Sequence, residues 1–198
     1  VNRALVGRVA NNCNPTTTYI DVGTGVVLPT TLHLGDGLEG TITNCRLTSE
    51  YFLFGASDVS CEALDFTGKY SFQYVRGAEL HNCTLKTKDA FWHSENVTVY
   101  DSVIEGEYLG WYSENLHLVR CHISGTQPLC YCKNLILEDC TMDGADLAFE
   151  YSDVNADIKG HVISVKNPRS GRISADSIGE VIKENSVMET DCVIESKG

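Results

Sequence analysis

The sequence lacks any run of 18 consecutive apolar residues, which is about the length that a transmembrane helix requires. Basic residues are also scarce, because 15 Lys and Arg stand against 27 Asp and Glu and leave a formal charge of −12 at pH 7. DNA, RNA and anionic membranes attract basic surfaces, so we expect no nucleic-acid partner and no membrane partner. The first residues show no basic segment followed by an apolar core, and therefore no recognisable signal peptide.

Motifs for common catalytic and metal sites are missing as well. The sequence contains no glycine-rich phosphate loop, no Gly-x-Ser-x-Gly and no His-Glu-x-x-His. Cys130 and Cys132 form a Cys-x-Cys pair, but no second pair stands at a zinc-site spacing, so two inward residues of one buried segment are the favoured interpretation. We expect neither a metal nor another cofactor.

What the sequence does contain is an internal repeat with a period of nineteen positions. The phrase FWHSEN at residues 91–96 returns as GWYSEN at residues 110–115. Parallel columns of apolar residues, Gly, and Asn or Asp recur at the same period, and we expect six successive coils without an insertion. The positions that anchor these coils are Cys45, Leu64, Cys83, Ser102, Cys121 and Cys140.

Apolar residues alternate within each repeat, which indicates strands rather than helix. Gly, Asn and Asp at fixed positions supply the turns between them. Three short strands and three bends per repeat predict an all-β protein, a right-handed, single-stranded parallel β-helix in which each strand pairs with its copy about 4.8 Å away. Asn96, Asn115 and Asn134 should form an amide ladder inside the solenoid or along a bend.

The columns divide the chain into three regions. Residues 1–37 do not fit them and predict an N-terminal cap or irregular first coils. Residues 38–153 predict the six regular coils, and residues 154–198 predict a closing coil and a C-terminal cap. Caps are expected because the end of a solenoid otherwise exposes strand edges and apolar core.

The nine cysteines are odd in number, and most occupy columns in which other coils carry Leu or Ser. A disulfide framework would not exchange with Leu, so we interpret them as reduced, small hydrophobic residues of a cytoplasmic protein. A secreted protein is the less favoured alternative, which the glycosylation-type triplets at Asn82 and Asn96 would fit.

The stretch from Gly68 to Cys140 and the later VISVKNPRSG at residues 162–171 resemble a bacterial family of uncharacterised proteins. That family is classed with the pectin-lyase-like right-handed β-helices. The resemblance covers about residues 38–182 and implies the same fold. It implies no established activity, and it suggests a carbohydrate only by analogy, since one fold hosts many functions.

One side of each coil, beginning six residues after the anchor, is predicted as a strand whose side chains alternate between two faces. Trp92 and Trp111 should then stack inside the core in one column with Gln73, Cys130 and Phe149. The outward set should contain Phe72, Phe91 and Leu129 together with Tyr70, Tyr74, Asp89, His93, Tyr108, Tyr112, Gln127, Tyr131, Asp146, Ala148 and Glu150.

Aromatic rings beside hydrogen-bonding groups are typical of sugar sites. The first hypothesis is therefore a carbohydrate-binding or carbohydrate-processing protein that contacts a glycan or small molecule. The ligand-binding residues would be Tyr70, Tyr74, Tyr108, Tyr112, Tyr131, Asp146 and Glu150. The alternative is a non-catalytic scaffold or homo-oligomer that associates through the Tyr and His side chains, and a purely structural Tyr ladder is a third interpretation.

Asp89, His93 and Glu107 are the candidates for catalysis, although the sequence leaves open whether the protein is an enzyme. Asp89 and Glu107 on neighbouring coils could lie about 5–6 Å apart, near the separation in a retaining glycosidase, and His93 could exchange a proton with Asp89. Glu105 and Asp143 form a second weak pair at about 9.6 Å. The expected surface carries no Arg or Lys, so glycoside hydrolysis is favoured over a calcium-dependent lyase reaction.

Overall fold

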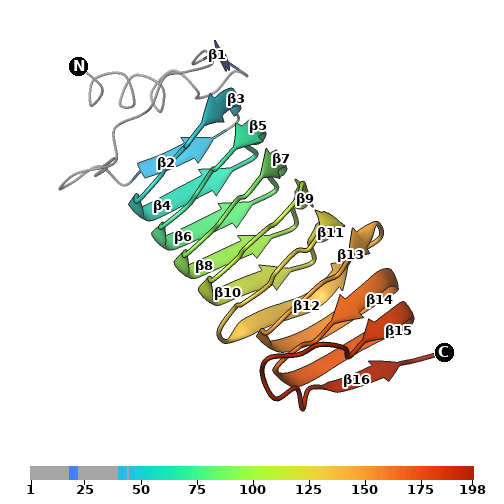
Figure 1. Ribbon diagram of the computed structural model, residues 1–198. Helices are drawn as coiled ribbons and strands as arrows, with labels where there is room; N and C mark the ends of the chain where they lie inside the picture. The colour runs from blue at the N-terminus through green and yellow to red at the C-terminus, as the bar shows by residue number, and fades with distance from the viewer. Residues whose placement is uncertain (1–17, 22–39, 44) are drawn as a thin grey trace.

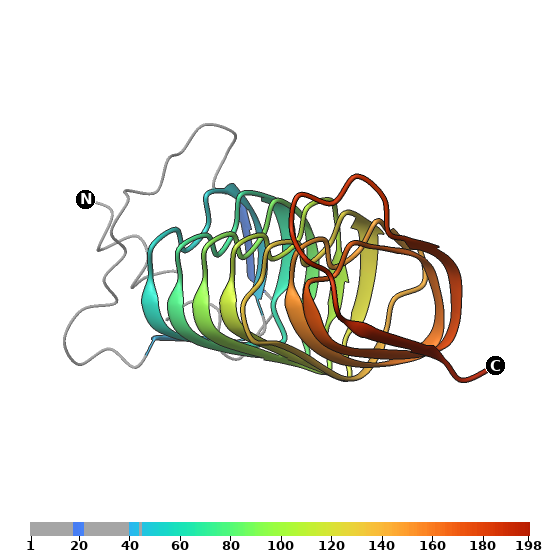
Figure 2. The same ribbon diagram turned by 60° about the horizontal axis from the view of Figure 1, so that its bottom comes forward.

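The chain forms a parallel β-solenoid in which adjacent coils are separated by one period of the sequence repeat (Figure 1). The computed structural model describes residues 18–21, 40–43 and 45–198. They make about eight coils, which stack along one axis as Figure 2 shows. Strands and turns account for these residues, which include no helix and hence none that could span a bilayer. The predicted all-β parallel solenoid is confirmed.

Two parallel sheets form two sides of the solenoid. The first contains β2 (Gly40–Thr43), β4 (Ser57–Glu62), β6 (Arg76–His81), β8 (Glu95–Tyr100), β10 (Glu114–Val119) and β12 (Leu135–Thr141). The second contains β1 (Thr18–Asp21), β3 (Cys45–Glu50), β5 (Asp65–Lys69), β7 (Thr84–Lys88), β9 (Val103–Glu105) and β11 (His122–Thr126). The longer β12 pairs with both β10 and β11 and so joins the two sheets.

The pairing register explains why apolar columns recur in the sequence. Val97 pairs with Leu116 and Ile104 pairs with Ile123, in each case one period of the repeat apart. Equivalent side chains therefore lie directly above one another, and the inward columns form a continuous core. Leu80, Val99 and Leu118 are completely buried members of one such column.

The stack continues after β12 through β13 (Ala145–Asp146), β14 (Asp153–Lys166), β15 (Ser170–Ile182) and β16 (Val193–Ser196). β14 pairs in parallel with β12 and β15, and β16 pairs with β15. The cap expected for residues 1–37 lies outside the described residues except for Thr18–Asp21, which pair in parallel with β3.

The prediction of six coils without an insertion is wrong near residue 143. His122 pairs with Thr141, one period of the repeat further on, whereas the step from Thr126 to its partner Asp146 is longer by one position. One additional residue therefore lies between Thr141 and Ala145 and displaces the turn residues that follow it by one position, until Leu135 and Val154 pair at one period of the repeat again.

The third side of each coil is a chain of turns, and the strand predicted there is not formed. Every second residue has a positive φ, as at Tyr70, Phe72 and Tyr74 with 60°, 56° and 57°. Residues other than glycine disfavour a positive φ, so backbone hydrogen bonds to the adjacent coils must hold this conformation in place. The N–H of Tyr74 donates to the Trp92 carbonyl at 2.8 Å, and the N–H of Phe91 donates to the Ser71 carbonyl at 3.0 Å.

This backbone corrects which side chains face the core. Phe72, Phe91 and Leu129 were expected outside and are completely buried, with the rings of Phe72 and Phe91 stacked 4.9 Å apart. Trp92 and Trp111 were expected inside and are only half-buried. The strict alternation of a strand does not hold when the sign of φ alternates along the chain.

Candidate functional site

Tyr74, His93, Tyr112 and Tyr131 form a column of rings along the solenoid axis, here called the aromatic strip. Neighbouring ring centroids are 4.9, 5.0 and 4.8 Å apart, with interplanar angles of 12°, 7° and 13°. Tyr74 and Tyr112 keep 47% and 45% of their surface exposed, and His93 is exposed as well. The outward orientation predicted for these side chains is confirmed.

Stacking determines which part of each ring a ligand can reach. Within the strip, the faces of adjacent rings lie against one another. Tilted rings flank both ends, because Phe54 lies 5.2 Å from Tyr74 and Tyr151 lies 5.7 Å from Tyr131. The strip therefore presents ring edges to solvent, with phenol hydroxyls and imidazole nitrogens at the spacing of the coils.

Trp92 and Trp111 lie beside the strip and connect successive coils. Their rings stack 5.4 Å apart at 6°. The indole N–H of Trp92 donates to the Tyr108 carbonyl at 2.6 Å, and that of Trp111 donates to the Gln127 carbonyl at 2.7 Å. Trp111 also meets Tyr112 and Tyr131 edge to face, at 6.3 and 5.4 Å. Trp111 thus packs against two rings of the strip, and Trp92 supports Trp111 from the preceding coil.

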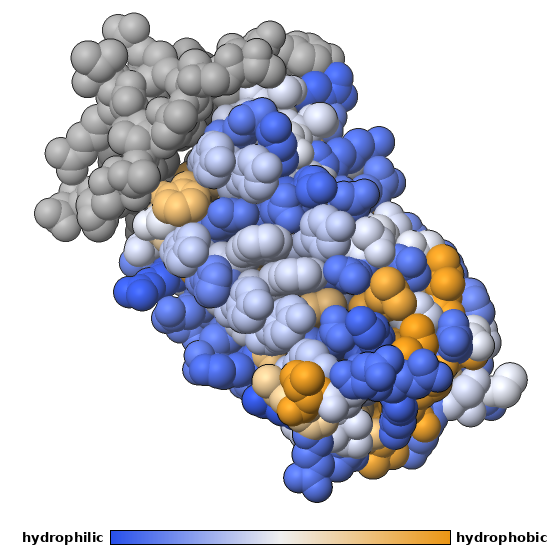
Figure 3. Space-filling view, in the orientation of Figure 1, coloured by the Kyte–Doolittle hydropathy of each residue, from blue (hydrophilic) through white to orange (hydrophobic). Residues whose placement is uncertain are grey.

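Rows of paired charges accompany the strip on the preceding and following segments of each coil. In the preceding row, Lys69 pairs with Glu50 and Lys88 pairs with Glu107, both at 2.9 Å. In the following row, Arg76 pairs with Glu95 at 3.6 Å and Lys133 with Glu114 at 3.7 Å. Figure 3 shows pale, flat side chains along the axis with hydrophilic groups on both sides. Exposed pairs of this kind add little stability, but they leave the borders of the strip without net charge.

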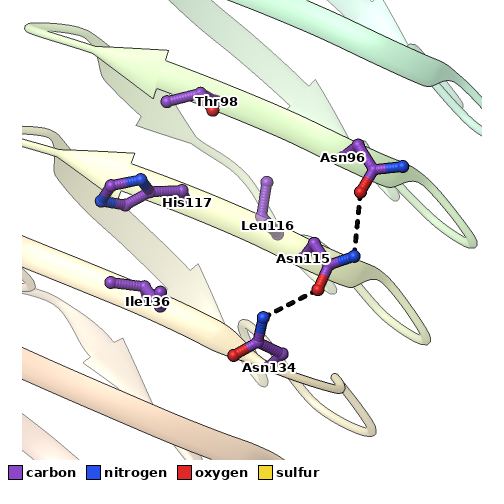
Figure 4. A pocket seen from close by; sticks show the side chains of 7 residues that line it. All are labelled: Asn96, Thr98, Asn115, Leu116, His117, Asn134 and Ile136. Atoms are coloured by element: carbon purple, nitrogen blue, oxygen red, sulfur yellow. Dashed lines mark hydrogen bonds between the residues drawn. The ribbon is translucent and has the colours of Figure 1, made fainter.

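A groove of about 300 Å³ lies on the outer side of β8, β10 and β12 (Figure 4). It is called here the amide groove, and Asn96, Thr98, Asn115, Leu116, His117, Asn134 and Ile136 line it. The Asn115 side-chain amide donates to Asn96 Oδ1 at 2.9 Å, and the Asn134 amide donates to Asn115 Oδ1 at 2.7 Å. The predicted amide ladder is confirmed, and its place is the exposed bend.

The family model for DUF3737, described as a protein of unknown function, matches residues 36–195. The chain belongs to the DUF3737 family. The matched residues include both the aromatic strip and the amide groove of this DUF3737 protein. No curated protein and no solved structure matches the chain.

The candidate catalytic residues of the DUF3737 protein are only partly brought together. Asp89 is buried, and this burial raises its pKa above the ordinary value, while Lys88 lowers that pKa and Glu107 raises it. Glu107 is exposed and bonded to Lys88. In the described coils no hydrogen bond or ion pair joins His93 to Asp89, so His93 stands apart from the two carboxylates.

The remaining predicted site residues fall into two groups. Tyr70 and Tyr108 lie outside the strip, where Tyr70 stacks on Tyr51 at 4.9 Å and Lys88 lies 5.0 Å from the centre of the Tyr108 ring. Asp146 is half-buried in β13. Glu150 does not continue the strip, and it pairs with Lys166 at 2.9 Å.

Sequence reasoning missed Tyr151, which occupies the place expected for Glu150 because of the additional residue near position 143. The available signal was the sequence Tyr-Ser-Asp at residues 151–153, which repeats the Tyr-Ser-Glu of residues 112–114 one position late. No group of three or more His, Cys, Asp or Glu side chains suited to a metal ion occurs among the residues that the structure describes.

Proposed function

We propose that this protein binds an extended, uncharged glycan along the aromatic strip. The observation that carries the proposal is the regular spacing of the exposed ring edges, 4.8–5.0 Å over four coils. A periodic row of binding groups suits a periodic ligand, and a polysaccharide presents hydroxyl groups at regular intervals. Phenol hydroxyls and imidazole nitrogens can both donate and accept hydrogen bonds, as sugar hydroxyls do.

Charge supports a neutral ligand. The ion-paired rows beside the strip offer no excess of cations for an acidic polymer, and the formal charge of −12 opposes polyanions at long range. The paired ring faces favour binding through hydrogen bonds at the ring edges over stacking of sugar rings on aromatic faces.

Binding is favoured over hydrolysis because His93 stands apart from Asp89 and Glu107, the pair on which hydrolysis would depend. The sequence resemblance to pectin-lyase-like β-helices adds support for a carbohydrate ligand by analogy only.

Calorimetry with oligosaccharides of neutral β-glucan, xylan and mannan tests the proposal, with polygalacturonate oligomers as the acidic comparison. Tyr112→Phe removes one hydroxyl and keeps the stack, so we expect about 5- to 10-fold weaker binding, as for the loss of one hydrogen bond. Tyr100→Phe is the matched control, since Tyr100 stacks on His81 at 4.6 Å in the same manner outside the strip. Equal binding by both variants, or no binding of any neutral oligomer, would refute the proposal.

Association with another protein, including a second copy of this chain, is the alternative, and one observation favours it. Val187 is 84% exposed and Met188 is 47% exposed, and the Val187 N–H donates to the hydroxyl of Tyr151 at 3.2 Å. Apolar groups at the end of an aromatic row are typical of protein interfaces. Sedimentation of the ligand-free protein distinguishes the two candidates, because only self-association through the strip predicts an oligomer that Tyr112→Ala dissociates.

A further inference from the structure

The amide ladder has unused hydrogen-bonding capacity at both ends. In the coil before Asn96 the equivalent position is Gly77, which has no side chain to accept a bond from the Asn96 amide. In the coil after Asn134 the equivalent residue is Asp153, whose carboxylate has no proton to donate and is held by Arg169 and Ser170. An amide N–H therefore remains available at one end and an amide oxygen at the other.

The direction of the ladder strengthens these two ends. Both bonds run from the later coil to the earlier one, from Asn134 to Asn115 and from Asn115 to Asn96. Bonds in such a head-to-tail chain polarise one another, which makes the Asn96 amide a better donor and the Asn134 oxygen a better acceptor. All three residues have a positive φ, from 50° to 56°, so the backbone holds their side chains at equivalent positions.

The other residues that line the groove include a hydroxyl group, an apolar side chain and an imidazole nitrogen without a hydrogen bond. Thr98 contributes a hydroxyl and Ile136 an apolar surface. His117 Nε2 lies 3.2 Å from Glu138 Oε1 but makes no hydrogen bond, so this buried nitrogen is unsatisfied. Figure 4 shows Thr98, His117 and Ile136 in one column beside the column of asparagines.

We propose that the amide groove binds an N-acetylated sugar residue through its acetamido group. The N–H of the acetamido group can donate to the free oxygen of Asn134, and a ring hydroxyl can accept from the Asn96 amide, two coils away along the ladder. Ile136 provides an apolar contact for the acetamido methyl group, and Thr98 provides a partner for a ring hydroxyl. A volume of about 300 Å³ is at the lower end of ligand pockets and suits a single residue.

The inference rests on the proposed function in one respect, namely that the ligand is a glycan. The strip and the groove use the same three coils, since His93, Tyr112 and Tyr131 precede Asn96, Asn115 and Asn134 by three residues each. The inference goes beyond the proposed function by naming an acetamido group as the feature that the protein recognises.

Nuclear magnetic resonance with N-acetylglucosamine as the probe tests the groove independently of the strip. We expect the side-chain amide signals of the three asparagines to shift on titration, and glucose and glucosamine to bind at least 10-fold more weakly. Asn115→Gly keeps a residue that tolerates a positive φ and removes the middle amide, so the protein should remain folded while the shifts are lost. Tyr100→Phe, which lies outside both the strip and the groove, should leave the titration unchanged.

Each other outcome has a definite meaning. If glucose and N-acetylglucosamine bind equally, the acetamido assignment is wrong, while glycan binding by the strip stands on its own experiment. If N-acetylglycine methylamide binds as tightly as the sugar, the groove recognises peptide-type amides and the sugar assignment fails. If no probe shifts the asparagine signals, the ladder is structural and the inference fails entirely.

Discussion

Trp92 and Trp111 lie parallel on adjacent coils, with ring centroids 5.4 Å apart and planes 6° from parallel. Each indole N–H also donates to a backbone carbonyl of the following coil. Together the two side chains connect three consecutive coils on the side of the solenoid that has no strand. Gln73 makes the equivalent bond one coil earlier, to the Asp89 carbonyl at 2.8 Å.

Replacing Trp111 separates the contribution of its hydrogen bond from that of its ring. Trp111→Phe keeps an aromatic ring and should lower the free energy of unfolding by about 1 kcal/mol, as for one lost hydrogen bond. Trp111→Ala also removes the stack and should cost about 3 kcal/mol, the lower end for large aromatics because the ring is half-buried. Urea denaturation followed by circular dichroism measures both values, and equal effects of the two substitutions would exclude a role for the ring.

Asp89 and Asp101 should make the stability depend on pH in opposite directions. Burial raises the pKa of Asp89 above its ordinary value of 3.8, so the folded state binds the extra proton and stability falls as pH rises from 3.8 through the raised pKa. Asp89→Asn removes this loss. The variant should therefore gain stability relative to the natural protein as pH rises, and denaturation at a series of pH values measures it.

Asp101 provides the comparison. Its hydrogen bonds with Arg120, at 2.6 and 2.7 Å, lower its pKa below 3.8. The associated stability is present above 3.8 and is lost as pH falls through the lowered pKa. Asp101→Asn should therefore be less stable than the natural protein at neutral pH, and this difference in stability should disappear in acid. If the stability difference from the natural protein changed with pH in the same direction for both variants, the opposite pKa shifts assigned to Asp89 and Asp101 would be contradicted.

The sequence was sufficient to predict the coils but not the third side. The register of Val97 with Leu116 equals the repeat period, so the columns can be read without a structure. A strand and a chain of turns with alternating φ both give a period of two, and FWHS fits either. The two structures differ in which residues face inward. In the chain of turns the adjacent residues Ala90 and Phe91 are both buried and His93 is exposed, whereas a strand would place Ala90 and Phe91 on opposite faces.

The candidate site was predicted in part for the same reason. Tyr74, His93 and Tyr112 face solvent in both interpretations, so their column was recognised from the sequence. Glu150 was misplaced because the residue added between Thr141 and Ala145 lies in a bend, where no apolar column reveals it. The amide groove could not be foreseen as a cavity, since its depth depends on the side chains of three strands.

Gly125 should be intolerant of even the smallest side chain. Its φ is 126°, and an added Cβ would lie 2.1 Å from the backbone oxygen of Gly106 in the preceding coil. Gly125→Ala must therefore push two coils apart, and we expect it to cost well over 1 kcal/mol in the free energy of unfolding. Gly144→Ala is the matched control, because its nearest neighbour would be 3.7 Å away. Thermal denaturation that ranks the two variants equally would contradict the close approach.

The seven described cysteines should react slowly in the folded protein, and all nine should react after unfolding. Seven cysteines in the described coils are free and buried, and burial raises the pKa of Cys83 and Cys132 to about 11. Thiolate is therefore scarce at these two positions at neutral pH, and burial gives the reagent little access to all seven thiols. Titration with a thiol reagent should give slow labelling of these seven thiols in the native protein and nine reactive groups in guanidinium without reductant. A plateau below nine would indicate disulfides.

Each of four successive coils contributes one ring to the aromatic strip, so under the proposed function the number of such coils would set the length of ligand that the strip contacts. Insertion of one whole repeat would lengthen the strip by one ring, about 4.9 Å, and leave its borders unchanged. An insertion of any other size changes which residue carries the ring, as the longer step between Thr126 and Asp146 does. Members of this family that differ in length by whole repeats should consequently differ in the ligand length they prefer, and not in its chemistry.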